Sequence, residues 1–301
     1  MLRIEGLSKT YANGTVALKE VSLSIPRGMF GLLGPNGAGK STLMRIIATL
    51  QEPDSGAVHF DAIDALKDKT AIRRILGYLP QEFGLYKNVS AEDLLDHFAV
   101  LKGIIDKSQR RQIVDRLLEQ TNLAADRRKH LGGYSGGMRQ RFGIAVALLG
   151  TPQLIIVDEP TAGLDPAERL RFLNLLAELG QQAVVILSTH IVEDVSELCS
   201  RMAIINKGEI RLEADPLSAI ATLKGRVYLK AVDRSQLAAY NASHAVISTK
   251  LLAGRTVIRI LSDSHPADGF APIDPSLEDV YFAAMRSKAE PALAAALHTN
   301  P

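Results

Sequence analysis

MFGLLGPNGAGKST occupies residues 29–42, and this stretch decides the fold of the chain. Residues 29–33 are mostly apolar and predict a buried strand, while residues 40–50 have the apolar spacing of a helix. The loop between them matches G-x-x-x-x-G-K-[ST], in which backbone N–H groups and a helix N-terminus wrap a phosphate. A glycine-rich turn before a helix is the alternative interpretation. The candidate phosphate-binding residues are Gly34, Pro35, Asn36, Gly37, Ala38, Gly39, Lys40, Ser41 and Thr42.

An apolar strand that ends in two acids, LIIVDEP at residues 154–160, would complete such a site. Lys40 of the first motif would reach the β and γ phosphates of a nucleotide, and the Ser41 hydroxyl would bind Mg²⁺. Asp158 would approach the same Mg²⁺, and Glu159 would direct a second carboxylate at the γ phosphate as a water-activating base. By itself a solvated strand end explains both acids, but the phosphate loop favours nucleotide hydrolysis.

A second glycine-rich helix start, LGGYSGGMRQR, lies between these motifs at residues 131–141. Backbone N–H groups of Ser135, Gly136 and Gly137, together with the positive end of the following helix, could hold a γ phosphate. By itself this segment is more typical of a flexible loop with a helix cap than of a phosphate site.

The composition excludes several classes of protein. With 35 Lys and Arg against 33 Asp and Glu and 47% hydrophobic residues, we expect a folded chain with no general attraction to nucleic acid. Its one cysteine, Cys199, excludes an intrachain disulfide and falls on an apolar helical face, where we expect it to be buried. The longest uncharged stretch, residues 142–157, is too short and too interrupted to span a bilayer. Since the N-terminus lacks the apolar core of a signal peptide, we expect a cytoplasmic chain.

Strand and helix patterns alternate from residue 58 to residue 205, which indicates an α/β architecture with a parallel sheet. Before this region, residues 2–7 and 21–25 alternate apolar and polar side chains around a turn at 13–14, which predicts antiparallel strands. The remaining expected strands are 154–157 and 183–187, and the expected helices are 91–102, 108–120, 136–149, 166–179 and 191–199.

The pattern changes after residue 215, where strands at 226–232 and 256–261 bracket a helical stretch near 235–240. We therefore divide the chain into a nucleotide-binding domain at 1–215 and a small α+β accessory domain at 216–286. The Ala-rich residues 287–301 are expected to be a disordered tail.

Taken in order, these motifs resemble the nucleotide-binding subunit of an ATP-binding cassette (ABC) transporter over residues 1 to about 215. The phosphate loop, YSGGM at residues 134–138 and the Asp158-Glu159 pair match that family's first phosphate motif, signature and second carboxylate motif. Three further matches are Gln81 in YLPQE, Asp165 in GLDP, which resembles a dimer-contact loop, and His190, which resembles a switch histidine. The resemblance implies a P-loop NTPase fold of the ABC ATPase type, with an N-terminal antiparallel β subdomain and a helical subdomain that carries the signature.

The resemblance also implies cofactors and partners. Two such subunits, most simply a homodimer, would stack head to tail and hold Mg²⁺ and ATP between Lys40 and Ser41 of one copy and residues 135–137 of the other. Gln81 would complete the Mg²⁺ and water shell, and His190 would bind the γ phosphate and orient the attacking water. ATP binding would close the pair and hydrolysis would reopen it, driving separate integral-membrane permease subunits at the cytoplasmic face of the membrane.

The same resemblance implies that two residues near the N-terminus contact the nucleotide base. Tyr11 lies where the family stacks an aromatic ring on adenine, and Val16 would add an apolar contact. Without the resemblance, Tyr11 is a turn residue, and His190 is a helix-cap histidine.

Two signature positions depart from the family pattern, because Tyr134 stands where Leu is usual and Met138 where Gln is usual. This variant resembles the signature of exporters of drugs, antibiotics and polysaccharides, as do residues 83–90 and 276–282. Residues 276–282 also read as a capped amphipathic helix. The resemblance therefore implies export, while the cargo stays open.

Two alternative interpretations of the sequence are a GTPase and a soluble ABC-type ATPase that acts on DNA or ribosomes. A GTPase requires Asn-Lys-x-Asp, whereas residues 206–209 read NKGE and predict a hairpin turn. DNA- or ribosome-acting relatives carry a long coiled-coil insertion or two cassettes in one chain, which 301 residues do not accommodate.

A permease would dock near residues 81–100, where aromatic and apolar side chains gather. Alternatively these side chains only cover the neighbouring helices. The candidates are Phe83, Leu85, Tyr86 and Phe98.

Overall fold

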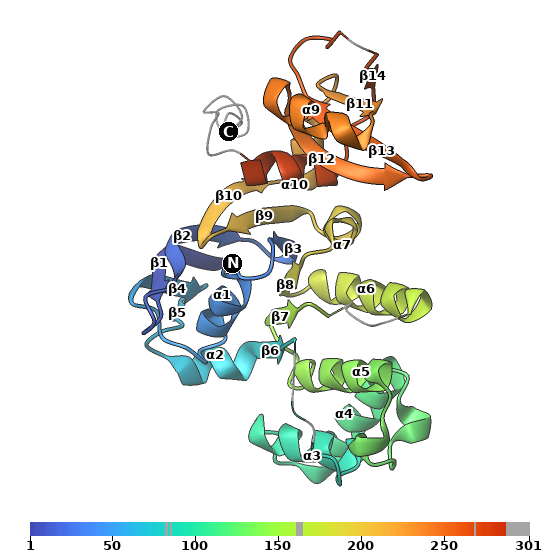
Figure 1. Cartoon of the computed structure of the whole chain (residues 1–301). Coiled ribbons are helices and arrows are strands. Elements are labelled where there is room, and N and C mark those ends of the chain that lie inside the picture. The colour runs from blue at the N-terminus through green and yellow to red at the C-terminus, as the bar shows by residue number, and fades with distance from the viewer. Residues whose placement is uncertain (82–83, 85, 161–164, 268, 287–301) are drawn as a thin grey trace.

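The computed structural model describes residues 1–81, 84, 86–160, 165–267 and 269–286. Its strands form an antiparallel N-terminal sheet, a six-stranded central sheet and an antiparallel C-terminal sheet. Figure 1 shows a tall molecule with three helices, α3 (Ala91–Leu101), α4 (Lys107–Gln120) and α5 (Gly136–Ala147), at its lower end and the C-terminal sheet at its upper end. The predicted α/β fold with an antiparallel N-terminal part is confirmed.

The central sheet has the order β10-β9-β3-β8-β7-β6, and its strands are parallel except for β10 at one edge. Successive residues of a strand point to opposite faces, so Met29 and Phe30 of β3 enter different hydrophobic cores on the two sides of the sheet. The strands are β3 (Gly28–Leu33), β6 (Leu76–Leu79), β7 (Leu154–Asp158), β8 (Val184–Thr189), β9 (Arg201–Asn206) and β10 (Glu209–Ala214).

Three neighbouring strands of this sheet, β3, β8 and β7, end at the same edge. The phosphate loop follows β3, Glu159 follows β7 and His190 follows β8. Since the carboxyl ends of parallel strands meet at one edge, residues that are far apart in sequence converge there.

The N-terminal sheet has the order β2-β1-β4-β5, with strands β1 (Leu2–Thr10), β2 (Val16–Ile25), β4 (Ser55–Phe60) and β5 (Ile63–Asp64). The antiparallel pair around residues 13–14 is confirmed. Val58, which the sequence pattern placed at the start of the parallel region, instead lies in β4 and pairs with Ile4 of β1. The prediction was wrong at this strand, because pairing with a partner fifty residues earlier leaves no local signal.

Most predicted helices are confirmed within a few residues. The first one is shorter than expected, because Thr49 adopts a left-handed backbone (φ 60°) and ends the turn before the exposed Leu50. The hairpin expected at residues 206–209 joins β9 and β10. The remaining helices are α1 (Lys40–Ile47), α2 (Lys69–Ile75), α6 (Pro166–Gly180), α7 (Val192–Leu198), α8 (Pro216–Ala221), α9 (Leu237–Ser243) and α10 (Leu277–Arg286), with 3-10 turns η1 (Ala124–Asp126), η2 (Leu131–Gly133) and η3 (Arg234–Gln236).

The C-terminal sheet has the order β12-β13-β11-β14 and a small core of its own around Tyr228, Ile258 and Phe270. By contrast, α10 packs against α7 and α8, and its apolar side chains belong to the large core of the central sheet. The predicted division at residue 216 stays a prediction, and the tail lies outside the described residues. The strands are β11 (Val227–Ala231), β12 (Ala245–Leu252), β13 (Arg255–Leu261) and β14 (Ala271–Pro272).

None of the helices in the described ranges combines the length and the apolar character that a bilayer crossing needs.

Cys199 lies in the large core and is 7% exposed, as predicted. Burial, with a smaller contribution from the charge of Asp194, raises the pKa of this thiol to about 12. Since only the thiolate reacts with disulfide reagents, we expect almost no labelling of the folded chain at pH 8, where about one thiol in 10⁴ is ionised.

Unfolding in urea should release one reactive thiol per chain, because the pKa then returns to about 8.5. Absorbance from an aromatic disulfide reagent measures both states. Rapid labelling of the folded chain would show that the α7 region opens readily.

Candidate functional site

A cavity of about 370 Å³ opens at the edge where β3 ends. Most of the predicted phosphate loop lines it, together with Gln81 and Glu159 from other parts of the chain. Its lining comprises Tyr11, Thr15, Val16, Ala17, Pro35, Asn36, Gly37, Gly39, Lys40, Ser41, Thr42, Gln81 and Glu159.

Two positions of the phosphate loop have room only for glycine. Gly39 has φ 111°, and a Cβ there would lie 2.5 Å from the carbonyl oxygen of Ala17. A Cβ on Gly34 would lie 2.4 Å from the carbonyl oxygen of Ile205. The loop is thus pressed against β2 and β9, and Ala38 is buried between them at 3% exposure.

Lys40, the first residue of α1, is 5% exposed. Its ammonium donates to the carbonyl oxygens of Gly34 at 2.7 Å and Pro35 at 3.3 Å. It also lies 3.4 Å from Glu159 Oε1, an ion pair without hydrogen-bond geometry. A buried ammonium requires such partners, and here they are the loop carbonyls and Glu159, which follows β7.

Glu159 follows β7 in a left-handed conformation (φ 50°), with its N–H donating to the carbonyl oxygen of Ser188 at 2.8 Å. This conformation costs a non-glycine residue about 1–3 kcal/mol, so the surrounding contacts must hold it. Its Oε2 lies 2.6 Å from His190 Nδ1, and the carboxylate therefore connects Lys40 with His190. The glutamate side chain is 6% exposed and the histidine side chain 54% exposed, so the pair extends from the interior to the surface.

Buried oxygen atoms without a hydrogen-bond partner gather beside this pair. Within the described residues they are Asp158 Oδ1, Glu159 Oε1 and Ser188 Oγ. Asp158 is 2% exposed and Ser188 is fully buried. Carboxylate and hydroxyl oxygens are ligands that Mg²⁺ prefers, so this donor set fits a divalent cation.

The N-terminal hairpin forms the opposite side of the cavity. The Tyr11 hydroxyl lies 2.9 Å from Thr42 Oγ1, and its ring is partly exposed beside Val16. Thr15 and Ala17 also line the cavity, and sequence reasoning missed both. The feature that could have indicated them is the hairpin register, in which Val16, the residue between them, pairs with Thr10.

Eight of the predicted site residues do not line the cavity. Gly34, Ala38 and Asp158 are chain neighbours of lining residues, and His190 contacts Glu159, whereas the other four belong to the starts of α5 and α6. Asp165 caps the N-terminus of α6, where its carboxylate accepts from the N–H of Glu168 at 2.8 Å. Ser135 likewise caps α5, accepting from the N–H of Met138 at 3.2 Å, and Gly136 and Gly137 follow it in the first turn. Gly163 and Leu164 of the dimer-contact motif lie outside the described residues, as do Phe83 and Leu85. One copy of the chain therefore does not bring its signature to its own phosphate loop.

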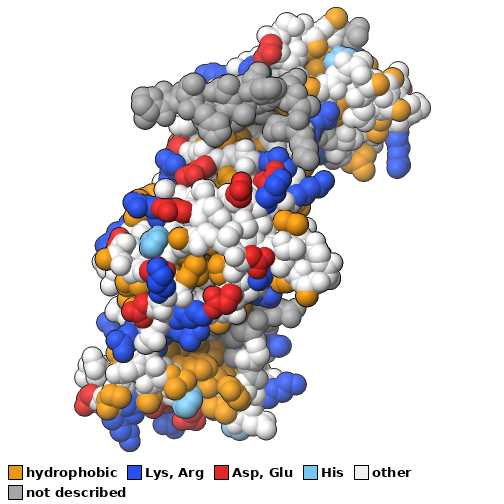
Figure 2. Space-filling view, turned by 90° about the vertical axis from the view of Figure 1, so that its left-hand side faces the viewer, with side chains coloured by type: hydrophobic (Ala, Val, Ile, Leu, Met, Phe, Trp, Pro, Cys, Tyr) orange, Lys and Arg blue, Asp and Glu red, His pale blue; other side chains and the backbone are white. Residues whose placement is uncertain are grey.

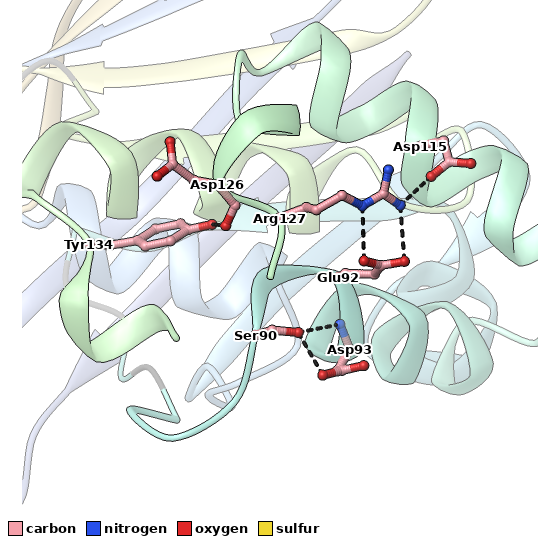
Figure 3. A network of polar contacts seen from close by, with 7 residues as sticks. All are labelled: Ser90, Glu92, Asp93, Asp115, Asp126, Arg127 and Tyr134. Atoms are coloured by element: carbon pink, nitrogen blue, oxygen red, sulfur yellow. Dashed lines mark hydrogen bonds and ion pairs between the residues drawn. The ribbon is translucent and has the colours of Figure 1, made fainter. Parts of the chain in front are cut away.

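A polar network holds the segment that leads into the signature (Figure 3). Arg127 forms a two-pronged ion pair with Glu92 at 2.9 and 3.0 Å and also contacts Asp115. The hydrogen bonds to Glu92 and Asp115 raise the pKa of Arg127, so it stays charged. These ion pairs join the segment after η1 to the start of α3 and the middle of α4.

Tyr134, the departure at the first signature position, is 3% exposed, and its hydroxyl donates to the carbonyl oxygen of Asp126 at 3.0 Å (Figure 3). The ring thus fills the core position that Leu would fill, and the hydroxyl finds a partner at the rim of the network. Met138 also packs against the large core.

Comparison with known proteins agrees with this arrangement. A family model described as ABC transporter matches residues 18–162. The uncharacterized ABC transporter ATP-binding protein YxlF of Bacillus subtilis (strain 168) is 38% identical over 70% of this chain and 69% of its own length. The doxorubicin resistance ATP-binding protein DrrA of Mycobacterium tuberculosis (strain ATCC 25618 / H37Rv) is 38% identical over 70% of this chain and 64% of its own length.

A longer relative and a solved structure extend the comparison. The "Probable multidrug ABC transporter ATP-binding protein YbhF" of Escherichia coli (strain K12) is 32% identical over 99% of this chain, which spans only 55% of that relative. A dimeric structure of the ATP-binding cassette MJ0796 in a post-hydrolysis state, bound to ADP and Pi, superposes with a TM-score of 0.66 at 29% identity. It covers 71% of this chain and 98% of its own. By motif order, by fold and by relationship, this chain belongs to the ABC transporter family.

Proposed function

We propose that this chain is the ATP-binding and ATP-hydrolysing subunit of an ABC transporter that exports its cargo through separate membrane subunits. The observation that carries the proposal is the contact chain from Lys40 and Glu159, which line the phosphate-loop cavity, to His190. It supports the proposal because an ammonium that would bind phosphate, a carboxylate that would accept a proton from water and a surface histidine lie within hydrogen-bond or ion-pair reach of one another.

The chemistry would divide among these residues as follows. Lys40 would exchange the carbonyl oxygens of Gly34 and Pro35 for phosphate oxygens of ATP. Glu159 would take a proton from the attacking water, so that ATP and water yield ADP and inorganic phosphate. His190 would orient Glu159 through its 2.6 Å contact and bind the γ phosphate with its exposed ring.

Mg²⁺ would neutralise charge on the phosphates when bound. Asp158 and Ser41 would hold it, with Gln81, which lines the same cavity. The unpartnered Asp158 Oδ1 supports this assignment. At the far side of the cavity Tyr11 and Val16 would receive the adenine ring.

A second copy of the chain would complete each site. The signature lies at the start of α5 outside the cavity, and its Ser135 and glycine N–H groups would bind the γ phosphate held by the other copy. The dimeric MJ0796 structure supports this arrangement. Asp165 would lie at the contact between the two copies.

The permease would dock on the surface near α3. Tyr86, Val100, Leu101 and Ile105 are large apolar residues that stay 65%, 39%, 69% and 75% exposed. Figure 2, which views the left-hand side of Figure 1, shows a hydrophobic patch at this lower end of the molecule. Phe98 lies partly buried against the large core, so it supports the surface from beneath. Docking there would hold the chain at the cytoplasmic face of the membrane.

We infer the direction of transport and the class of cargo from the relatives. DrrA is described as a doxorubicin resistance protein and YbhF as a probable multidrug transporter component, so we propose drug or antibiotic export. Residues 216–286 would form an accessory domain beside the cassette of residues 1–215.

The test measures Mg-ATP hydrolysis by the purified chain, alone and with the membrane protein that co-purifies from detergent-solubilised membranes. Stimulation by that protein supports the proposal. Turnover that instead responds to DNA or ribosomes, with no membrane protein recovered, would leave an ATPase but remove the transporter assignment.

A further inference from the structure

An ion pair joins α6 to α7, the helix that begins directly after His190 and Ile191. Arg169 of α6 directs Nε at Asp194 Oδ1 of α7 over 2.9 Å and Nη2 at the same oxygen over 2.5 Å. The Asp194 side chain is fully buried, whereas the Arg169 side chain is 33% exposed. A fully buried carboxylate is costly without a charged partner, so this contact fixes how α6 and α7 lie together.

Both members of the pair lie near the start of their helices. The N–H of Arg169 donates to the carbonyl oxygen of Asp165 at 2.8 Å, and Asp165 caps α6. Asp194 lies in the first turn of α7, which begins directly after His190 and Ile191 and has no side-chain cap. The start of α7 therefore depends on contacts other than a cap for its position.

Two polar contacts bracket the start of α7. Glu159 contacts His190 just before this helix, and Arg169 of α6 contacts Asp194 in its first turn. The two helices also pack against each other. Moving the start of α7 would consequently move the imidazole away from the glutamate carboxylate.

We infer that Arg169 and Asp194 are positioning residues that hold His190 against Glu159. The inference rests on the proposed function, because the reaction it serves is ATP hydrolysis at that site. Arg169 presents two nitrogens to one carboxylate oxygen, a geometry that the single ammonium of Lys cannot reproduce.

The experiment compares Arg169→Gln with Arg171→Gln, the same change at an exposed arginine of the same helix. We expect Arg169→Gln to lower the maximal ATPase rate about 10- to 100-fold, because small displacements of catalytic groups have effects of this size. ATP affinity should change less than about threefold, since the phosphate loop is untouched, and Arg171→Gln should match the wild type. Arg169→Lys, which keeps the charge and favours folding, should fall between them.

A double-mutant cycle separates positioning from a general structural role. In a His190→Ala background, Arg169→Gln should cause no further loss of turnover, because the residue it positions is already gone. Equal losses in both backgrounds would overturn the inference, as would unchanged turnover in the single variant.

A second readout does not depend on catalysis. The imidazole nitrogen signals of His190, assigned by their absence in His190→Ala, should shift in Arg169→Gln and stay in place in Arg171→Gln. If the wild-type chain hydrolyses no ATP, the proposed function fails, and these signals alone decide whether the pair positions the histidine. Unmoved signals in a folded Arg169→Gln protein would overturn the inference.

Discussion

Glu159→Gln is expected to bind ATP with nearly wild-type affinity while turnover falls by about 10²- to 10⁴-fold, the range that a positioned general base contributes. The amide keeps the shape of the side chain and can keep a contact with His190, but it cannot accept a proton from water. The loss of charge also removes the ion pair with Lys40, which leaves that ammonium free for phosphate. Steady-state ATPase assays and equilibrium nucleotide binding measure the two effects separately.

The same variant should accumulate as a dimer in the presence of Mg-ATP, because closure would no longer be followed by hydrolysis. Light scattering behind a gel-filtration column, with and without ATP, detects the change in mass. Glu178→Gln, an exposed glutamate of α6, provides the matched control and should behave as the wild type. A Glu159→Gln protein that stays monomeric with full turnover would contradict the proposed base and the proposed assembly together.

Arg259→Ala is expected to destabilise the chain by about 3 kcal/mol, the lower end of the cost of leaving a buried carboxylate without its charged partner. Arg259 of β13 contacts both oxygens of Asp279 at 2.9 Å, and Asp279 is 1% exposed. Ser276 also donates to Asp279 through its N–H and its hydroxyl, which moderates the loss. The pair links the C-terminal sheet to α10, so its removal should loosen that link.

Urea unfolding followed by circular dichroism measures this change, and limited proteolysis locates it. Arg226→Ala is the matched control, since Arg226 pairs with Asp263, whose side chain is 84% exposed. Exposed ion pairs contribute at most about 1 kcal/mol, so this control should unfold close to the wild type. Equal unfolding midpoints for the two variants would show that the buried carboxylate has other sufficient partners.

The parts of the site that were predictable from sequence are those built from consecutive residues. The phosphate loop and the strand and helix that flank it occupy one uninterrupted stretch, and their pattern carries its own geometry. The contact between Glu159 and His190 was less accessible, because it depends on β7 and β8 being neighbours in the sheet. Only the resemblance to a family had placed those two residues together.

Other structural features were not predicted from the sequence, because they depend on residues that are distant in the chain or on backbone groups. Strand β12 was not expected, since its second half is exposed on both sides and shows no alternation of apolar and polar residues. The Tyr134 hydroxyl donates to a backbone carbonyl oxygen, and the sequence does not indicate such a partner because every residue has a backbone carbonyl. Likewise, nothing in the sequence around Asp194 indicates that a carboxylate there is fully buried and faces an arginine of the preceding helix.

The large hydrophobic core has a practical consequence for anyone who wishes to trim this chain. Residues well beyond the sequence boundary at 216, among them Leu223, Val227 and Val280, share one apolar core with α5, the helix that begins with the signature. A fragment that stops at residue 215 would lack α8 and α10, which pack against α7. Apolar side chains of the core would then be exposed to water, and we expect such a fragment to aggregate. Shortened versions of the chain should therefore retain α8 and α10, or replace with polar side chains the apolar ones that α10 now shields.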